Sequence, residues 1–277
     1  MEFSAEFKEG VRGELFHLTR SPSDKKPGFM VLVVQTFAEE ANKSRYAISQ
    51  MADQISKQGG AMVLFDHYGT GDSFGDHADA TLTGWAQDLQ TIVIDLKASN
   101  NCPIHLFAIR SGALIAMSVD SSVFKNLASV SFLNPVLNGK QFIGQFFRLR
   151  LAADLFGDGD SKVTMADIKA ELRDSGVTEI AGYSLGARLV SEFEAFSLDK
   201  VLDKESKLIE GCVINWLELN TQVKESVLPI SKRQIDLMLA KGALVKSKPM
   251  IGDQFWSTQE ISSCSGPLLS HLDELYR

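Results

Sequence analysis

Cysteine is scarce in this sequence, and its few copies are not arranged for a structural role. Of 277 residues only three are cysteines, and they lie far apart at Cys102, Cys212 and Cys264. An odd count without close spacing excludes a disulfide framework and a cysteine-ligated metal site, and it is typical of proteins in a reducing compartment. We therefore expect a cytoplasmic protein with no bound metal and no cofactor.

Positive charge and long apolar runs are also scarce. Lys and Arg number 28 against 35 Asp and Glu, which gives a formal net charge of −7 and an isoelectric point near 5.3. Without a basic stripe, this charge excludes nucleic acid and an anionic membrane surface as main partners. No apolar run approaches the roughly 18 residues of a membrane span, and the polar start MEFSAEFKEG is unlike a signal peptide. The composition makes no prediction for the oligomeric state.

Short apolar runs alternate with amphipathic stretches along most of the chain. The 44% hydrophobic content of 277 residues suffices for one sizeable core. Strands are predicted within 1–26 and at 29–34, 61–65, 104–109, 127–133, 212–219 and 243–251. Helices are predicted among them at 40–58, 85–96, 231–241 and 267–275. This order predicts an α/β fold with a mainly parallel central sheet and helices on both faces.

The alternation is interrupted between the strands ending at residue 133 and beginning at residue 212. Helical periodicity is seen there at 141–155, 164–175 and 186–196. We expect residues 1–277 to form a single domain in which about 140–210 is a helical insertion. Such an insertion is predicted to lie as a lid over the carboxyl edge of the sheet.

Three phenylalanines mark the packing face of this expected lid. Phe142, Phe146 and Phe147 have roughly helical spacing, so they belong on one face of the first helix of the insertion. The simpler interpretation is that they pack the lid onto the sheet. The alternative is that they form a groove for an acyl chain.

The stretch from residue 103 to residue 120 is the centre of the arrangement. Ile104–Ile109 has the length and composition of a buried strand, the chain turns at Arg110-Ser111-Gly112, and an apolar helix follows. A strand, a tight turn and a buried helix are the context of a nucleophile elbow, whose pattern is G-x-S-x-G. Here residues 108–112 read Ala-Ile-Arg-Ser-Gly, so Arg110 stands where the attacking serine is expected.

Three further stretches have the spacing of the same fold. The strand at 29–34 runs into Gln35-Thr36-Phe37, where an oxyanion-hole amide is expected. Residues 66–73, DHYGTGDS, match the pattern D-x-x-G-x-G-x-S, and the strand at 127–133 ends in Asn134-Pro135 ahead of the insertion. Together with the elbow, these stretches predict an α/β-hydrolase fold.

Longer runs carry a closer resemblance. They are FAEEANKSR (37–45), DHYGTGDSFGD (66–76), AIRSGALIA (108–116), NGKQFIGQFFRLRLA (138–152), IAGYSL (180–185) and DQFWSTQEI (253–261). In these runs, and over nearly its whole length, the chain resembles the exosortase A system-associated hydrolases of the second type. The resemblance implies a cytoplasmic hydrolase of bacteria that make exopolysaccharide and sort PEP-CTERM proteins. It also implies an elbow that carries arginine at the position of Arg110.

The parts of a Ser-His-Asp mechanism are missing from their expected places. The loop before the last helix, 252–256, contains no histidine, and His271 comes about one helix later. The loop for the acid, after the strand at 212–219, offers only Glu225. We interpret His271 as a histidine on a helix surface, so the triad is predicted to be degenerate.

Two other motifs are weaker candidates for catalysis. His67 and His77 flank the glycine loop, where either could face the site. A second G-x-S-x-G lies at 182–186 and is centred on Ser184. Because it falls inside the insertion rather than after the central strand, we interpret it as a helix cap and not as an elbow.

Arg110 stays charged at neutral pH and is no nucleophile. A charge at the elbow requires a partner, and Glu39 and Glu40 on the facing loop are the natural ones. One interpretation is a buried Arg–Glu pair that ties two loops together. The other is an anion site, in which Arg110 and the backbone N–H groups of Ser111 and Phe37 hold a carboxylate or a phosphate.

Two functions of different classes follow. The first is an ester or thioester hydrolase of exopolysaccharide and exosortase systems with a degenerate triad, for which Arg110 and Ser111 are the candidate catalytic residues. The second is a non-catalytic pseudo-hydrolase that binds an anionic ligand or a protein partner. Both take a small-molecule acyl or anionic ligand as the expected occupant of the site.

Overall fold

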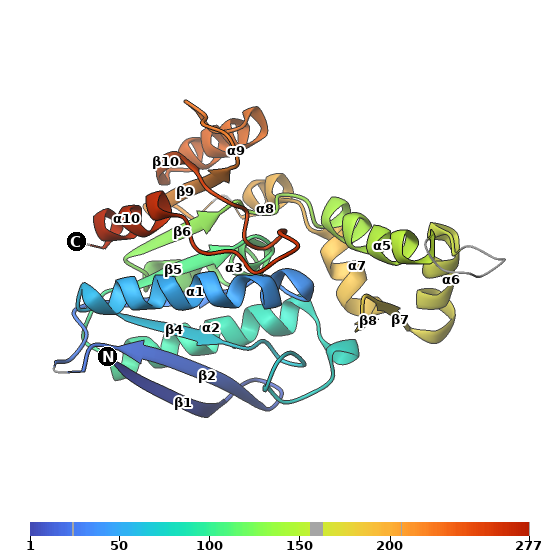
Figure 1. Ribbon diagram of the computed structural model, residues 1–277, viewed down its shortest axis with the longest axis horizontal. Coiled ribbons are helices and arrows are strands. Elements are labelled where there is room, and N and C mark those ends of the chain that lie inside the picture. The colour runs from blue at the N-terminus through green and yellow to red at the C-terminus, as the bar shows by residue number, and fades with distance from the viewer. Residues whose placement is uncertain (24, 156–162, 206, 277) are drawn as a thin grey trace.

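The computed structural model describes residues 1–23, 25–155, 163–205 and 207–276 (Figure 1). Over these residues the central sheet has eight strands in the order β1-β2-β4-β3-β5-β6-β9-β10. The strands are β1 (Glu2–Glu9), β2 (Glu14–Ser21), β3 (Met30–Val34), β4 (Ala61–Phe65), β5 (Ile104–Ile109), β6 (Ser129–Leu133), β9 (Val213–Asn220) and β10 (Leu244–Ile251). β1, β2 and β4 pair antiparallel, and all pairs from β4 to β10 are parallel. The predicted α/β class with a mainly parallel sheet is confirmed.

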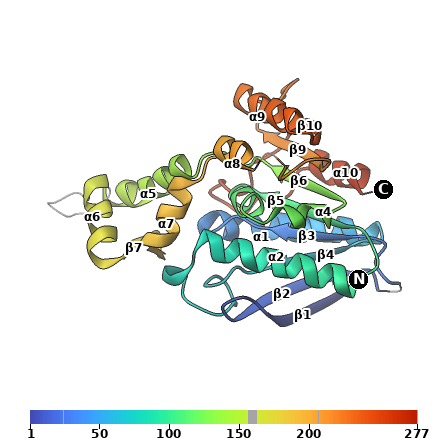
Figure 2. The same cartoon turned by 180° about the vertical axis from the view of Figure 1, so that it is seen from behind.

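Helices cover both faces of this sheet. α1 (Glu39–Lys57) and α10 (Gly266–Leu275) pack on one face, and α2 (Leu82–Ser99), α3 (Gly112–Ala116) and α9 (Pro229–Ala240) on the other (Figures 1 and 2). Along β5 the side chains alternate between the two cores, with Leu106 toward α2 and Phe107 toward α1. Successive strand residues point to opposite faces, so a doubly covered strand is apolar throughout.

The other predicted elements are present with slightly shifted ends. The strand expected at 127–133 is β6, and the helix expected at 231–241 is α9. A short helix α4 (Ser121–Lys125) and a 3-10 turn η1 (His77–Asp79) have no counterpart in the sequence-based prediction. In the part of the chain that the structure describes, no helix is both long and apolar enough to cross a membrane.

The chain reverses direction at Arg110, directly after β5. Arg110 has a φ of 52°, a left-handed conformation that residues with a side chain adopt rarely. Its N–H donates to the carbonyl of Leu133 at the end of β6 (3.0 Å), and α3 begins two residues later. Gly112 approaches β3 so closely that a Cβ there would lie 2.1 Å from the carbonyl oxygen of Val34. The backbone therefore has the form of a nucleophile elbow, with an arginine at its tip.

Between β6 and β9 the chain leaves the sheet. This segment contains α5 (Gly139–Leu155), α6 (Met165–Ser175), β7 (Val177–Ile180), β8 (Tyr183–Gly186), α7 (Ala187–Ala195) and α8 (Leu198–Lys204). Figures 1 and 2 show most of it to one side of the sheet. Phe37, which follows β3, packs against Phe142 and Phe146 of α5, with ring centres 5.5 Å apart in both pairs. The 139–204 segment therefore meets the sheet at the carboxyl ends of the parallel strands.

The hairpin of β7 and β8 corrects one prediction. The sequence suggests a helix cap at 182–186, whereas Val177 to Gly186 form an antiparallel pair of strands. Ala181 and Gly182 connect them with φ values of 51° and 83°. Two positive φ values in a two-residue loop are characteristic of a type I′ hairpin turn. Ser184 is thus a strand residue, neither a cap nor the tip of an elbow.

The elbow geometry predicts that Gly112 tolerates no side chain. Gly112→Ala forces a Cβ against the Val34 carbonyl, and we expect it to lower the free energy of unfolding by about 2 kcal/mol or more. Gly144→Ala in α5 is the matched control, because a Cβ there meets nothing within 4 Å. Alanine also favours the helix, so this control is expected to be neutral or stabilising by up to ~1 kcal/mol. Urea unfolding measures both, and equal stabilities of the two variants would contradict the close approach.

Candidate functional site

The side chain of Arg110 is held by three segments that are far apart in the sequence. One terminal nitrogen donates to Glu40 Oε1 at the start of α1 (3.2 Å), and the other donates to the carbonyl of Asn134 after β6 (3.1 Å). The guanidinium carbon lies 5.5 Å from the ring centre of Trp256, within the range of a cation–π contact. Side-chain exposure is 22% for Arg110 and 23% for Glu40, so the ion pair is largely but not fully desolvated.

Glu40 is connected to Ser111 through hydrogen bonds of Thr36. The hydroxyl of Thr36 donates to Glu40 Oε2 (2.9 Å), and the Thr36 and Ser111 oxygens lie 2.6 Å apart. Because the single hydroxyl proton of Thr36 goes to Glu40, Ser111 is the donor to Thr36. Ser111 is only 1% exposed. Its hydroxyl is therefore engaged in the packing below the elbow and does not point toward a substrate.

The two candidate glutamates have separate roles. Glu40 makes the contact with Arg110, whereas Glu39 lies 3.7 Å from Lys43, one turn along α1. Adjacent residues of a helix point about 100° apart, so only one of the two can face the elbow. The sequence predicts either glutamate as the partner of Arg110. In the structure α1 begins at Glu39, and the side chain that contacts Arg110 is that of Glu40.

Three of the residues that position Arg110 were not found from the sequence. Asn134 has a φ of 42°, and its side-chain oxygen accepts from the N–H of Leu219, which turns its carbonyl to the elbow. Thr36 is the link between Glu40 and Ser111. Trp256 belongs to the loop before α10, where the sequence has no histidine. Its ring contacts the guanidinium of Arg110. The motif Asn134-Pro135 at a strand end was the one available signal.

The expected loops supply no triad partner at the elbow. Glu225 is exposed in the loop after β9. His271 lies on α10, where its Nδ1 is 2.8 Å from Lys248 Nζ and 2.9 Å from Glu274. Burial is the main cause that lowers the pKa of His271. It is a helix histidine in contact with β10, as the sequence interpretation has it.

His67 and His77 lie together, beside the aromatic cluster under the 139–204 segment. Their rings pack on Trp85, with centres 5.1 and 6.0 Å away, and His77 also stacks on Phe37 at 5.9 Å. Burial lowers the pKa of His67 to about 4 and also lowers that of His77. Both rings are therefore neutral at pH 7, and neither is hydrogen-bonded to Arg110 or Ser111.

A cavity of about 240 Å³ opens between the start of α1 and α5. Its walls are aromatic, from Phe37, Phe142, Phe146 and Trp256, and its polar groups include Glu40 and Lys43. Arg110 contacts two of these walls but does not itself line the cavity. Phe147 does not line the cavity and is 1% exposed, in the same apolar cluster as Phe142 and Phe146.

The cavity suits an apolar group better than a free anion. Four aromatic rings offer an apolar surface, and Glu40 stands between the cavity and the guanidinium. Arg110 already donates to Glu40, and the Arg110 Nε, which has no partner among the described residues, is buried. Within the described ranges, no three His, Cys, Asp or Glu side chains are gathered closely enough to hold a metal ion.

Comparisons with known proteins identify the fold. No known family profile matches the sequence, and no curated protein matches it. Solved structures match over almost the full chain. Alpha/beta hydrolase domain-containing protein 10 from mouse has a TM-score of 0.57 at 13% identity, covering 98% of this chain and 98% of its own. The chain has the α/β-hydrolase fold.

Two further neighbours show how widely the fold is shared. Est1E from Butyrivibrio proteoclasticus with bound ferulic acid has a TM-score of 0.62 at 15% identity, covering 98% of this chain and 97% of its own. The thioesterase domain from the curacin biosynthetic pathway has a TM-score of 0.59 at 12% identity, covering 100% and 99%. At these identities the likeness establishes the fold and not the chemistry.

The geometry predicts that Arg110 and Glu40 stabilise each other. In a double-mutant cycle with Arg110→Met and Glu40→Gln, we expect a coupling energy of ~1.5 kcal/mol, between the values of surface and buried pairs. Methionine keeps an unbranched side chain without the charge, and the cycle cancels the other contacts that each single substitution removes. Unfolding in urea provides the four free energies.

An exposed pair provides the control. Arg173 and Asp174 lie 3.0 Å apart, with side chains 71% and 68% exposed, and Arg173→Met with Asp174→Asn removes the same two charges. These substitutions should couple by no more than ~0.5 kcal/mol. If the elbow pair couples no more strongly than this exposed pair, the ion pair does not hold the elbow in place.

Proposed function

We propose that this chain is an α/β-hydrolase-fold protein that binds an acyl-bearing ligand in the cavity between the start of α1 and the 139–204 segment. In this proposal the segment acts as the lid of a single domain, and the aromatic rings of Phe37, Phe142 and Phe146 surround the acyl chain. The single observation that carries it is the aromatic cavity next to an elbow whose tip is the paired Arg110.

An acyl-serine intermediate is no part of the proposed function. Ser111 is buried and donates to Thr36, and no histidine is hydrogen-bonded to it. A serine becomes a strong nucleophile only when an adjacent base accepts its proton. Arg110, Phe37 and Ser111 are instead proposed to shape and polarise the site, and anionic head groups would meet Lys43 before they meet Arg110.

Ester or thioester hydrolysis by a non-standard group is the second candidate. The observation that favours it is the carboxylate of Glu40, which lines the cavity and is oriented by Thr36 and Arg110. An oriented carboxylate can act as a general base toward water. The resemblance to the exosortase A system-associated hydrolases favours a substrate from exopolysaccharide or protein-sorting metabolism for either candidate.

The first test uses a fluorophosphonate probe, which reacts with activated serines. We expect no adduct on the native chain, because Ser111 has no base and Ser184 lies in a strand. Ser111→Ala and Ser184→Ala are expected to give the same null mass spectrum. A stoichiometric adduct that either variant removes would show that an activated serine exists, and peptide mapping would locate it.

The second test uses 1-octanoylglycerol, a neutral acyl ester. We expect it to bind, and Leu149→Asp to weaken binding at least about fivefold, because Leu149 lines the cavity and a carboxylate there opposes an acyl chain. Leu239→Asp on α9 is the matched control, since the two leucines are 44% and 47% exposed on helices. Equal affinities of the two variants would refute acyl binding in this cavity.

The same probe separates binding from turnover. Intact recovery of 1-octanoylglycerol after incubation supports the ligand-binding function. Release of octanoate that Glu40→Gln abolishes, while Glu39→Gln does not, supports the hydrolytic candidate instead. Glu39 is the matched control because it is the neighbouring carboxylate and pairs with Lys43 rather than with Arg110.

A further inference from the structure

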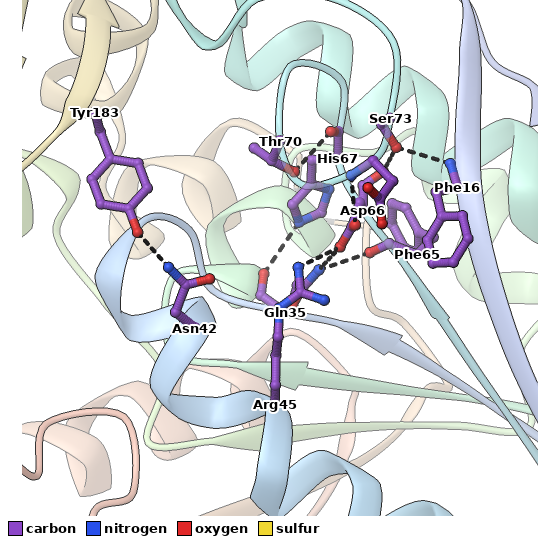
Figure 3. Close-up of polar contacts among 11 residues, drawn as sticks. Phe16, Gln35, Asn42, Arg45, Phe65, Asp66, His67, Thr70, Ser73 and Tyr183 are labelled. Carbon is purple, nitrogen blue, oxygen red and sulfur yellow. Dashed lines mark hydrogen bonds and ion pairs between the residues drawn. The ribbon is translucent and has the colours of Figure 1, made fainter. Parts of the chain in front are cut away.

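A second cavity, of about 150 Å³, adjoins the loop between β3 and α1. Gln35, His67, His77, Asn42 and Tyr183 are among the residues that line it. Figure 3 shows Asn42 directed at the hydroxyl of Tyr183, with Gln35 and Arg45 directed at Asp66. The two cavities have Phe37 in common, but Glu40, Lys43 and Trp256 line only the first.

The amide of Gln35 has a fixed orientation. Its nitrogen donates to the carbonyl of Phe65 (2.9 Å) and to Asp66 Oδ1 (3.0 Å), so both amide protons are used. Its oxygen is buried and has no hydrogen-bond partner among the described residues, although the side chain is only 2% exposed. A buried acceptor left without a donor is costly, so Gln35 calls for a donor from outside the protein.

His67 provides a second acceptor of the same kind. Its Nε2 lies 3.2 Å from the backbone oxygen of Gln35, which can only accept, so Nε2 carries the proton. Nδ1 is then the unprotonated nitrogen, and it is buried without a partner among the described residues. His67 is 1% exposed, and the lowered pKa keeps its ring neutral.

His77 adds a third acceptor from a different segment. Its Nδ1 lies 2.8 Å from the carbonyl of Ser184 and therefore carries the proton. Nε2 is left as an acceptor, and it too is buried without a partner in the described part of the chain. Three lining residues, from the loops after β3 and β4 and from η1, thus each keep one unsatisfied acceptor.

The charges around this cavity are already compensated. Asp66 accepts from Gln35, from Arg45 (3.1 Å) and from the N–H of Asp72 (3.1 Å). An added ammonium group would meet the Arg45 guanidinium, which also lines the cavity. An added anion would meet three acceptors and the carboxylate. The cavity therefore favours a neutral occupant that brings hydrogen-bond donors.

We propose that this second cavity is a binding site for a neutral polyhydroxylated group, such as a sugar residue or another polyol. Its hydroxyls would donate to Gln35 Oε1, His67 Nδ1 and His77 Nε2, and its C–H faces would pack on the rings of Phe37 and Tyr183. The volume equals about five water molecules at ~30 Å³ each, which suits a small polyol or one face of a sugar ring. The site goes beyond acyl binding and does not depend on it.

The test observes the imidazole nitrogens of the full chain by long-range ¹H–¹⁵N NMR, with methyl β-D-glucopyranoside as the probe. We expect the unprotonated nitrogens of His67 and His77 to shift, with a Kd of about 1 mM or below. His17 and His105 lie outside the cavity and are the internal controls. The fully O-methylated glucoside, which has no donors, should leave all four unmoved.

Tyr183→Leu tests the cavity wall, because it removes the ring on which the sugar face is proposed to pack and keeps an apolar side chain. It should weaken binding of the glucoside about fivefold. Tyr46→Leu on the exposed side of α1 is the matched control and should bind as the native chain does.

Three results would overturn the proposal. The first is that the glucoside leaves His67 and His77 unmoved, which would mean that water alone satisfies the acceptors. The second is that n-propylammonium shifts them and the glucoside does not, which would mark a cation site. The third is a shift with both the free and the O-methylated glucoside, which would show that hydroxyl donors are not recognised. Loss of acyl binding in the first cavity would leave this experiment unaffected.

Discussion

A largely desolvated positive charge at the tip of the central strand is the constraint on which this site depends. A guanidinium at that point cannot be left without partners, because its desolvation would cost several kcal/mol. Three segments therefore converge on Arg110, with the Glu40 carboxylate, the Asn134 carbonyl and the Trp256 ring. These segments follow β3, β6 and β10, so the contacts of one side chain link the carboxyl ends of three other strands. The elbow is therefore a junction of the fold, next to a cavity that Glu40 and Trp256 line.

The loop between β3 and α1 contacts the Arg110–Glu40 pair and also forms part of both cavities. Thr36 connects the ion pair to Ser111, and Phe37 forms a wall of each cavity. Gln35, which precedes Thr36, donates to the carboxylate of Asp66, the residue that follows β4. Three consecutive residues thus serve the elbow, the aromatic core and the polar site. Both cavities have a wall in this loop, so the two sites share a single structural element.

The sequence predicts the backbone of this protein better than its side-chain contacts. β5 was predicted with its observed ends, because six apolar residues before a turn have one simple interpretation. The β7–β8 hairpin was missed, because its turn depends on positive φ values at Ala181 and Gly182, and alanine gives no signal for that conformation. Glu40 and Glu39 could not be separated before the start of α1 was known. Trp256 meets Arg110 across almost 150 residues of chain, and no local pattern predicts such a contact.

The same distinction explains why the backbone of the elbow does not depend on the residue at its tip. What the elbow requires of its sequence is a left-handed residue at position 110, a glycine at position 112 where the backbone of β3 passes, and apolar strands on either side. None of these requirements concerns the side chain at the tip. Est1E and a thioesterase domain can therefore share this fold at 15% and 12% identity, while this chain has a fixed charge at the tip of its elbow. A charge at that position requires a partner, and Glu40 provides it. The site therefore contains an ion pair whose charges already compensate each other before any ligand binds.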